Sequence, residues 1–278
     1  MPYCLVIGGG RWGRIIAQKL SELSNEVNVV TEYKINESDI SRIEMIKLNR
    51  RPDLIYIASK TENHIIDYEI ARKIKTKIWV EKSFVPITID LINQFLLEGS
   101  SIFNMHLFNH SIDKIKHESI NSIKIISLIE RKILNNVSML DWLSHEFSII
   151  SRILWLNKEK VVDYNLIEIS KQNSNFNFIL KMNSILINVT LIESDVRYRE
   201  LTINDSNFYF TNWDGYFQFG TSDKLTAKKY MNFYNSSDLL KDSIKKALCS
   251  NKSDVNILTQ LILNIQNLIF PKILTNLA

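Results

Sequence analysis

Residues 3–23 read YCLVIGGGRWGRIIAQKLSEL, and this stretch constrains the fold more than any other part of the chain. An apolar run with the length of a buried strand leads into three glycines, and a segment with helical periodicity follows. Gly8, Gly10 and Gly13 occupy the glycine positions of the pattern G-x-G-x-x-G. Because the pattern stands between a predicted strand and a predicted helix, it predicts the dinucleotide-binding turn of a Rossmann domain.

Each glycine of this turn has a separate physical role. Gly8 permits the tight turn, Gly10 lets the backbone approach a pyrophosphate, and Gly13 lets the helix pack closely on the strand. The start of the helix adds amide donors and the positive end of its dipole. Arg11 and Trp12 lie inside the turn and are candidates for contact with the cofactor, although Trp12 could instead pack against the helix start.

The next strand, EVNVVTEY at 26–33, contains Glu32 near its end, 19 residues past Gly13. A carboxylate at this place accepts hydrogen bonds from the adenosine ribose and repels a 2′-phosphate, which favours NAD over NADP. Lys34 and Arg11 are close enough to the expected site to weaken this preference, so NADP stays possible. Alternatively, Glu32 is only the solvated end of a strand.

Strands and helices then alternate at short spacing. The predicted strands cover 52–59, 77–88 and 101–108, and the predicted helices between them cover 60–74 and 87–99. This order predicts a doubly wound parallel sheet, in which ligands bind at the carboxyl ends of the strands. Four polar side chains fall at those ends: Glu32, Ser59, Lys82 and His106.

Several short motifs follow one another in an order that resembles the glucose–fructose oxidoreductase/inositol 2-dehydrogenase family, often called Gfo/Idh/MocA. The resemblance covers roughly the first 157 residues. The motifs are the glycine turn at 8–13, IASKTENH at 57–64, VEKS at 80–83, FNHSIDKIK at 108–116 and LDWLSHEF at 140–147.

The resemblance implies a catalytic set of Lys82, Asp141 and His145 beside the nicotinamide. Oxidation of an alcohol needs a base for the hydroxyl proton, and histidine suits this role because its ordinary pKa of about 6.5 lies near neutral pH. Asp141 would orient the imidazole or bind a neighbouring substrate hydroxyl. Lys82 would hydrogen-bond the reacting oxygen and stabilise its developing negative charge.

The same resemblance implies further contacts around the coenzyme and the substrate. His106 would lie near the substrate, although it could also be a surface residue, and His64 could simply cap a helix. Asp141 and His145 could likewise be two polar residues of a helix at a domain boundary. The residues expected to lie against the cofactor are Ala58, Ser59, His64, Glu81 and Lys82.

Three positions depart from the family pattern. Ser83 stands where the family usually has proline, His106 where many sugar-acting members have arginine, and His110 where proline is common. The chain is also tens of residues shorter than most members. These departures leave the sugar specificity open more than they affect the cofactor.

The second half has strand patterns separated by Asn, Ser and Asp turns, which predict an antiparallel meander. A long strand is expected at 119–132, and the helix of Asp141 and His145 follows it to about residue 156. The strands of the meander are expected at 161–170, 175–182, 184–192, 197–204 and 206–213, and closing helices are expected at 236–249 and 253–275. We therefore predict a Rossmann domain over 1–117 and an α+β domain, built on a mostly antiparallel sheet, over 118–278. In the family that the motifs resemble, the other face of this sheet often forms the subunit interface, which implies a homo-oligomer. The aromatic stretch 208–219 would suit such burial, or it could equally belong to the core.

Composition excludes several other classes of protein. A chain that is 45% hydrophobic and 23% charged is typical of a globular protein, and its scattered Lys and Arg residues predict no nucleic-acid surface. Its two cysteines form no metal or disulfide pattern, so a reducing compartment and no metal are expected. No leader and no apolar run of about 18 residues is recognisable, which predicts a cytoplasmic protein without a membrane span.

The sequence thus predicts an NAD(P)-dependent oxidoreductase that acts on a small polyhydroxylated substrate, such as a sugar or sugar nucleotide. One alternative is a reductase of a C=N or conjugated C=C bond, like imine reductases or biliverdin reductase. A second alternative is a non-catalytic dinucleotide-binding subunit, although such a subunit would have no use for a proton donor.

Overall fold

The computed structural model describes residues 2–23, 26–32, 35–37, 39–82, 88–108, 112–114, 119–129, 136–172, 175–194, 198–211, 216–220 and 238–276. The chain forms two compact units. The N-terminal unit contains Met1–Phe108 and Leu240–Leu263, and the C-terminal unit contains Asn109–Leu239 and Asn264–Ala278. The sequence predicts one domain boundary, between residues 117 and 118, and this boundary stays a prediction. Each unit is described below by itself.

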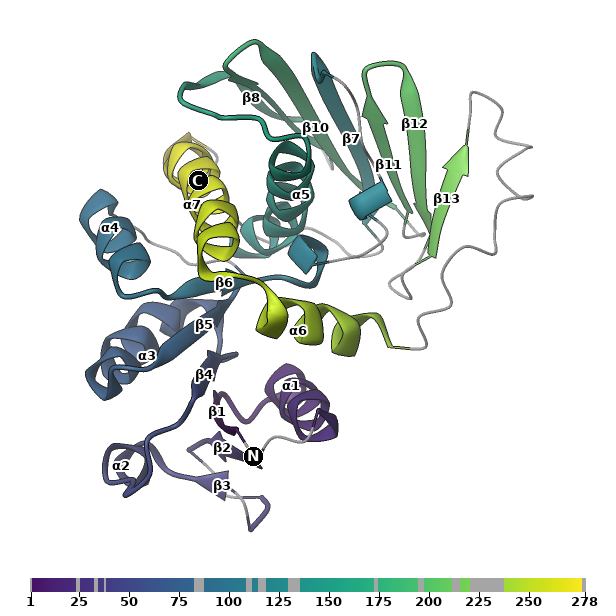
Figure 1. The fold of residues 1–278 in the computed structure, drawn as a ribbon. Helices are drawn as coiled ribbons and strands as arrows, with labels where there is room; N and C mark the ends of the chain where they lie inside the picture. Colours follow the sequence, from purple (N-terminus) through teal and green to yellow (C-terminus); the bar gives the residue numbers. More distant parts are fainter. Residues whose placement is uncertain are drawn as a thin grey trace. The chain divides into compact units, whose positions relative to one another are not determined.

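The N-terminal unit is built on a six-stranded parallel sheet with the order β3-β2-β1-β4-β5-β6 (Figure 1). This is the strand order of a Rossmann fold, and it confirms the predicted fold class. The strands are β1 (Tyr3–Ile7), β2 (Glu26–Val30), β3 (Asp39–Ile40), β4 (Leu54–Ile57), β5 (Lys77–Glu81) and β6 (Ser101–Phe103). The helices between them are α1 (Arg11–Glu22), α2 (Arg42–Ile46), α3 (His64–Ala71) and α4 (Ile89–Leu97).

The two central strands explain why this sheet forms. Every residue of β1 and of β4 is buried, as expected for parallel strands that are covered on both faces. Helix α1 adds Ile16, Ala17 and Leu20 to the core from its apolar face. The continuous apolar runs of the sequence therefore become the middle of the sheet, and their carboxyl ends lead into the loops of the candidate site.

The sheet differs from the sequence prediction at both of its edge strands. The strand predicted at 101–108 ends at Phe103, and a 3₁₀ turn follows at Met105–Phe108. The side chain of Asn104 accepts a hydrogen bond from the backbone N–H of His106 at 2.9 Å, which turns the chain out of the sheet. The edge strand β3 was not predicted, because two residues are too few to show a period.

A buried ion pair ties β3 to α1. Arg14 binds Asp39 with both terminal nitrogens, at 2.5 and 2.6 Å, and the Asp39 side chain is fully buried. Asp39 also accepts hydrogen bonds from the backbone N–H groups of Ile35 and Asn36. The hydrogen bonds from Arg14, with smaller contributions from these backbone groups, hold the pKa of Asp39 well below its usual range.

We expect Asp39→Ala to lower the free energy of unfolding by about 3 kcal/mol, because it leaves Arg14 without its buried partner. The matched control is Glu26→Ala, which removes an exposed ion pair with Arg50 at 2.8 Å on the same sheet. That change should cost less than about 1 kcal/mol. Urea unfolding at pH 7 measures both values, and equal losses would contradict the role assigned to Asp39.

The Asp39 effect should also depend on pH. Because the folded pKa is depressed, the stabilisation is complete above the unfolded value of about 4 and is lost as the pH falls toward the folded value. The difference between wild type and Asp39→Ala should therefore be smaller at pH 3 than at pH 7. A difference that stays constant over this range would show that the ion pair is not its source.

The C-terminal unit contains a seven-stranded mixed sheet with the order β13-β12-β11-β7-β10-β9-β8. Its strands are β7 (Ser122–Ile129), β8 (Tyr164–Gln172), β9 (Asn175–Met182), β10 (Ile185–Glu193), β11 (Tyr198–Ile203), β12 (Ser206–Thr211) and β13 (Tyr216–Gly220). All its pairings are antiparallel except that of β7 with β10. The prediction of a mostly antiparallel sheet is confirmed.

The simple meander predicted for these strands is wrong at one place. Strand β7 lies between β10 and β11, so β10 and β11 are consecutive in sequence but are not paired. Helix α5 (Asn136–Leu156) follows β7 and supplies part of the crossover that two parallel strands require. Local strand patterns show no sign of such an insertion, because they carry no information about distant pairing.

Alternating side chains fix which face of this sheet forms the core. Leu201, Ile125, Val189 and Phe178 are paired across four neighbouring strands, and all four are buried. Phe147 of α5 packs edge-on against Phe178, with ring centroids 5.8 Å apart. The register therefore places α5 against the apolar face of the sheet.

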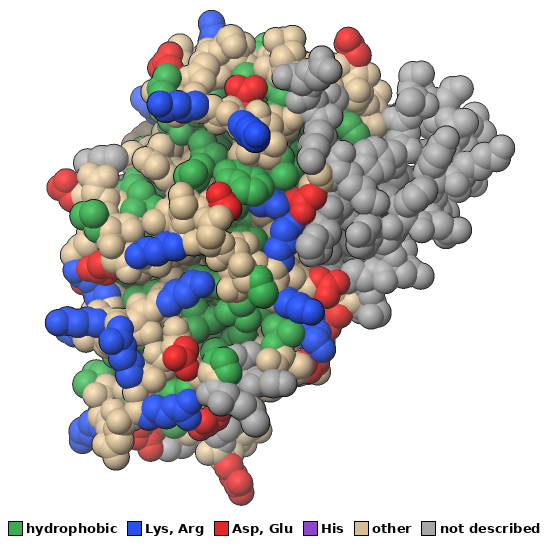
Figure 2. Space-filling model, in the orientation of Figure 1, with side chains coloured by type: hydrophobic (Ala, Val, Ile, Leu, Met, Phe, Trp, Pro, Cys, Tyr) green, Lys and Arg blue, Asp and Glu red, His purple; other side chains and the backbone are tan. Residues whose placement is uncertain are grey.

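Two helices close the chain: α6 (Leu239–Cys249) and α7 (Lys252–Asn276). Among the described residues, only Lys252–Thr275 within α7 is long and apolar enough to span a membrane, and 56% of its most apolar window is buried in the protein. Helix α7 is thus a core helix. On the face shown in Figure 2, Lys and Arg side chains are spread over the surface among acidic and hydrophobic ones. The cytoplasmic location stays a prediction.

Candidate functional site

The glycine turn after β1 is packed too closely for side chains at Gly8 and Gly13, the first and last glycines of the pattern. Gly8 has a φ of +120°, and a Cβ there would lie 2.6 Å from the carbonyl carbon and oxygen of Ala58. A Cβ at Gly13 would lie 1.9 Å from the carbonyl oxygen of Gly8. The backbone N–H of Gly8 also donates to the carbonyl of Val30 at 2.9 Å. The turn is therefore held against β2, β4 and α1 by backbone contacts.

Gly10 differs from these two glycines because it faces open space. It is the N-cap of α1, with φ −70° and ψ 177°, and a Cβ there would meet no atom within 4 Å. The first intrahelical hydrogen bond runs from the N–H of Arg14 to the carbonyl of Gly10. The amide groups of the first helical turn are left for a ligand, and the helix dipole favours a negatively charged one.

A cavity of about 600 Å³ opens beside this turn, and we call it the coenzyme cavity. It lies at the carboxyl ends of β1, β2 and β4, where the strand order of the sheet reverses. All its lining residues belong to the N-terminal unit. They are Ile7, Gly8, Gly9, Gly10, Arg11, Trp12, Val30, Thr31, Glu32, Ile35, Arg42, Ala58, Ser59, Lys60 and Asn63.

The coenzyme cavity suits a dinucleotide. Its volume lies within the usual range for small-molecule sites. The hydroxyl oxygen of Ser59 is buried and has no hydrogen-bond partner in the part of the chain that the structure describes. An unpaired buried hydroxyl on a cavity wall is stabilised when a ligand supplies the missing partner. The glycine turn and this hydroxyl together provide an anion site and an adjacent polar contact.

Glu32 stands at one end of the coenzyme cavity, and its side chain is 71% exposed. Arg42 lies close by, with its guanidinium 3.9 Å from the Glu32 carboxylate. The same guanidinium donates to Asp67 at 2.5 Å, and the Asp67 side chain is almost fully buried. Sequence reasoning missed Arg42. The capping box formed by Ser41 and Glu44 marks its helix, but its pairing with Asp67, 25 positions away, has no local signal.

Trp12 lines the coenzyme cavity, and a hydrogen bond to Glu81 holds its indole ring. The indole N–H of Trp12 donates to the Glu81 carboxylate at 2.8 Å, and the hydroxyl of Tyr56 donates to the same oxygen at 2.6 Å. Burial, followed by the nearby Glu81 charge, raises the pKa of Tyr56 well above its usual value, so the phenol keeps its proton. Within the described cavity wall, Glu81 is a support for Trp12 and not a lining residue.

His64 has a comparable supporting position. It begins α3, is buried, and its Nε2 lies 2.9 Å from the carbonyl oxygen of Ser59. When Nε2 carries the proton, this contact is a hydrogen bond that holds the turn after β4. The described part of the cavity wall includes Ala58 and Ser59 but not His64.

Lys82 and His106 lie after neighbouring strands of the same unit. Lys82 follows β5 directly and is half-buried. His106 lies in the 3₁₀ turn after β6 and is buried. Both residues therefore lie at the carboxyl edge of the sheet. The predictions made for Ser83, His110 and Lys34 fall outside the described residues.

Asp141 and His145 lie one turn apart on α5, in the C-terminal unit. Asp141 is half-buried, whereas His145 is 4% exposed. The ring of Trp142 lies 5.9 Å from the imidazole, measured between centroids. The structure thus brings Asp141 and His145 together on one helix. Lys82 belongs to the other unit, and its convergence with them stays a prediction.

A buried ion pair next to His145 anchors α5 to the sheet. One carboxylate oxygen of Glu146 accepts hydrogen bonds from the hydroxyl of Ser127 at 3.0 Å and from Arg199 at 3.1 and 2.7 Å. Ser127 is on β7 and Arg199 is on β11, so the contact joins the helix to two strands. Sequence reasoning missed this pair, because Glu146 and Arg199 are 53 positions apart.

Comparison by sequence finds no family model and no curated protein that matches the chain. Solved structures do match it. A Gfo/Idh/MocA family oxidoreductase from Vibrio cholerae covers 99% of this chain and 100% of its own, with a TM-score of 0.60 and 10% identity. A dehydrogenase (MviM) from Clostridium difficile covers 96% of this chain and 99% of its own, with a TM-score of 0.60 and 17% identity.

A third structure was solved with its ligands. It is the WlbA (WbpB) dehydrogenase from Thermus thermophilus in complex with NAD and UDP-GlcNAcA. It covers 97% of this chain and 95% of its own, with a TM-score of 0.64 and 11% identity. These likenesses span the whole chain, and at such low identity they establish the fold.

The fold thus has two parts: a Rossmann sheet and an α+β part built on a mixed sheet. In particular, it is the fold of the Gfo/Idh/MocA oxidoreductases. The resemblance seen in the sequence motifs is confirmed at this level.

Proposed function

We propose that this protein is an NAD(P)-dependent oxidoreductase of the Gfo/Idh/MocA family. The observation that carries the proposal is the coenzyme cavity, because its glycine turn, helix start and unpaired Ser59 hydroxyl lie where a Rossmann sheet binds dinucleotides. The fold supports it as well, since the structural neighbours are dehydrogenases and oxidoreductases.

A nicotinamide coenzyme held in this cavity would accept or supply a hydride. In the proposed mechanism, His145 takes the hydroxyl proton of the substrate on its imidazole, or returns it in the reverse direction. Asp141 orients the imidazole from one turn away, and Lys82 donates a hydrogen bond to the reacting oxygen. His106 contributes to substrate binding. The anchored helix α5 would keep the imidazole fixed during proton transfer.

The proposed substrate is a small polyhydroxylated molecule, either a sugar or a sugar nucleotide. The support is that the neighbour from Thermus thermophilus was solved with a UDP-sugar. A panel of sugars and UDP-sugars, together with cyclic imines, tests this class with NAD(H) and NADP(H). Turnover of the imines alone would select the C=N reductase in place of the sugar dehydrogenase.

We expect the wild-type protein to bind NADH at least about tenfold more tightly than NADPH, because the Glu32 carboxylate repels a 2′-phosphate. In Glu32→Gln this repulsion is gone, and Arg42 stays in place through Asp67, so NADPH should bind at least as well as NADH. Quenching of protein fluorescence measures both affinities, since Trp12 lines the cavity.

The control for this titration is Arg42→Gln in the Glu32→Gln background. Loss of the Arg42 guanidinium should remove the improvement in NADPH affinity and leave NADH affinity within about twofold. The two variants therefore distinguish the effect of the Glu32 charge from that of the Arg42 charge. A wild-type protein that prefers NADPH would contradict the role of Glu32. If neither nucleotide binds, the proposed function itself is wrong.

We further propose that the protein forms a homo-oligomer through its C-terminal sheet. The face of this sheet opposite the core has Leu186 at 45% exposure, together with half-buried Ile126 and Ile179. Such side chains on an open sheet face are stabilised when a second copy covers them. Sedimentation at micromolar concentration tests this, and a mass of one chain, 32.5 kDa, would contradict it.

A further inference from the structure

A second and larger cavity, of about 920 Å³, lies at the opposite ends of the strands of the Rossmann sheet, where the strands begin. Its walls include the first residues of β5 and β6, whereas the coenzyme cavity lies at the carboxyl ends of β1, β2 and β4. All its lining residues belong to the N-terminal unit. We call it the amino-edge cavity, and no role in the proposed reaction accounts for it.

The amino-edge cavity is strongly basic. It contains only two carboxylates, those of Glu69 and Glu98. Six cationic side chains line it: Arg51, Arg72, Lys73, Lys75, Lys77 and Lys252. Such an excess of one charge in a concave site raises the local potential and attracts ions of the opposite sign.

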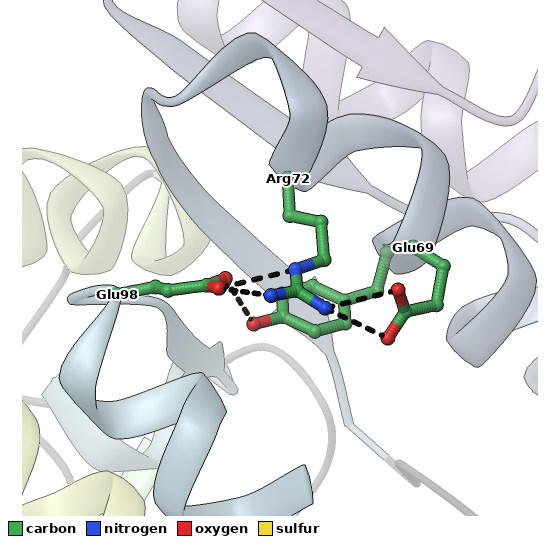
Figure 3. A network of polar contacts seen from close by, with 4 residues as sticks. Glu69, Arg72 and Glu98 are labelled. Atoms are coloured by element: carbon green, nitrogen blue, oxygen red, sulfur yellow. Dashed lines mark hydrogen bonds and ion pairs between the residues drawn. The ribbon is translucent and has the colours of Figure 1, made fainter.

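One of the six cations already has partners. Arg72 binds Glu98 through Nε and Nη2, at 3.1 and 2.5 Å, and binds Glu69 through Nη1 at 3.1 Å (Figure 3). The hydroxyl of Tyr68 donates to the second oxygen of Glu98 at 2.7 Å. Both carboxylates are therefore engaged by a single guanidinium, and they are poor partners for the lysines around them.

The other five cations have no ion pair within 4.0 Å among the residues that the structure describes. Lys77 is the most informative of them, because it is half-buried at the start of β5. Its ammonium lies 4.9 Å from the centroid of the Trp79 ring, and burial lowers its pKa. An ammonium that is partly removed from water gains most from a bound anion.

Lys252 reaches the same cavity from the first turn of α7. A Cβ added to Gly99 would lie 2.8 Å from its Cε and 2.9 Å from its Nζ, so the lysine lies directly over the end of α4. Gly99 has a φ of +69° in addition, so that a side chain there would be strained twice. The Lys252 side chain is exposed, and its ammonium lies beside Gly99 on the cavity wall.

The backbone between the cations is also fixed. The hydroxyl of Thr76 donates to the carbonyl of Pro52 at 2.6 Å, which joins the segment before β5 to the segment before β4. Lys75 and Lys77 flank Thr76, and Arg51 precedes Pro52. One contact therefore keeps these three cations on neighbouring segments of the wall.

The cavity also offers a hydrogen-bond acceptor. The side-chain oxygen of Asn256, in the second turn of α7, is buried and has no partner among the described residues. An anion without a hydroxyl group, such as sulfate, would leave this oxygen unpaired, whereas a phosphate ester with sugar hydroxyl groups donates to it. The cations and the amide together match an organic phosphate.

We propose that the amino-edge cavity binds a small, multiply charged phosphate compound, such as a nucleotide or a sugar phosphate, at a site separate from the coenzyme cavity. The five available cations hold the phosphate groups, and Asn256 accepts a hydrogen bond from the sugar. The site is an effector site, because it lies at the edge of the sheet away from the strand ends that bind the coenzyme.

The test is calorimetric titration of the full chain with inorganic pyrophosphate and with ADP. The Gly10→Ala variant is the host protein, so that the coenzyme cavity does not take up the probe. We expect sub-millimolar binding of both compounds, weaker as salt is raised. Lys77→Gln should weaken it about tenfold, and Lys77→Gln/Lys252→Gln about 100-fold, since each removes one phosphate contact.

The matched control is Lys47→Gln, which removes an exposed lysine at the end of α2 and should leave the affinity unchanged. Equal weakening by Lys47→Gln would show a general charge effect and would overturn the proposal. Absence of binding below 5 mM (about the weakest useful affinity for an effector) would overturn it too. Binding of a single-stranded oligonucleotide with no binding of ADP would replace it with a nucleic-acid surface.

The result does not depend on the proposed oxidoreductase activity. If the wild type fails to bind NADH but binds pyrophosphate in a way that needs Lys77, the proposed function fails and the amino-edge site stands. If NADH binds and Lys77→Gln has no effect on pyrophosphate binding, the proposed function stands and the amino-edge site is wrong. The two cavities share no lining residue, so variants of one leave the other intact.

Discussion

Replacing Gly10 with alanine should weaken NADH binding by about 100-fold while the protein stays folded. The added methyl group would meet no protein atom within 4 Å, so it would project into the space beside the first turn of α1. A pyrophosphate bound to the amides of that turn needs this space. Because alanine is a poorer N-cap than glycine, we expect a fall of up to about 4 °C in the unfolding temperature.

Gly13→Ala is the contrasting variant. Its methyl group would lie 1.9 Å from the carbonyl oxygen of Gly8, so α1 must move away from β1. We expect the free energy of unfolding to fall by about 4 kcal/mol or more, which is the range of severe backbone clashes. Both variants should weaken NADH binding, but only Gly13→Ala should lose several kcal/mol of stability.

Thermal unfolding and fluorescence titration of the two variants decide where the coenzyme binds. If Gly10→Ala binds NADH as the wild type does, the pyrophosphate does not lie against the start of α1, and the coenzyme cavity loses its main support. If Gly10→Ala unfolds as readily as Gly13→Ala, the open space beside Gly10 is not present in solution.

The glycine turn was predictable because all its determinants are local. A buried strand, a turn that needs glycine at fixed places and the start of a helix follow one another within 21 residues, from Tyr3 to Leu23. The edge where the ligand should bind followed from the alternation of strands and helices. Glu32 and Ser59 were placed on that edge by the same reasoning, and the structure finds both on the cavity wall.

The contacts that support the site were not predictable, because their partners are far apart in sequence. Asp39 reaches Arg14 across 25 residues, and Glu146 reaches Arg199 across 53. A charged residue gives the same local signal whether it is solvated or buried with a partner. The place of β7 inside the second sheet was hidden for a related reason, since pairing between strands depends on the whole chain.

Replacing His145 with alanine should lower kcat by about 1,000-fold and leave NADH binding within about twofold of wild type. His145 is the proposed proton acceptor, and it lies on α5 in the C-terminal unit, whereas every described lining residue of the coenzyme cavity belongs to the N-terminal unit. A variant of the acid/base group should therefore affect the chemical step and not coenzyme affinity.

Two further variants of α5 distinguish a chemical role of His145 from a structural one. Ser148→Ala removes a buried hydroxyl that donates to the carbonyl of Ser144, and it should leave kcat within about twofold, since that group only bonds its own helix. Asp141→Asn keeps the side-chain shape but loses the charge, and we expect a smaller fall of about 10- to 100-fold, with no change in NADH affinity.

The pH profile gives a reading that a structural defect would not. In the wild type, kcat/KM for oxidation should rise as the general base loses its proton, and this limb should disappear in His145→Ala. If the variant keeps both the limb and its activity, His145 is a core histidine and another group moves the proton. If the wild type binds NADH but turns over no substrate and His145→Ala changes nothing, the buried imidazole is structural and the protein is a dinucleotide-binding subunit.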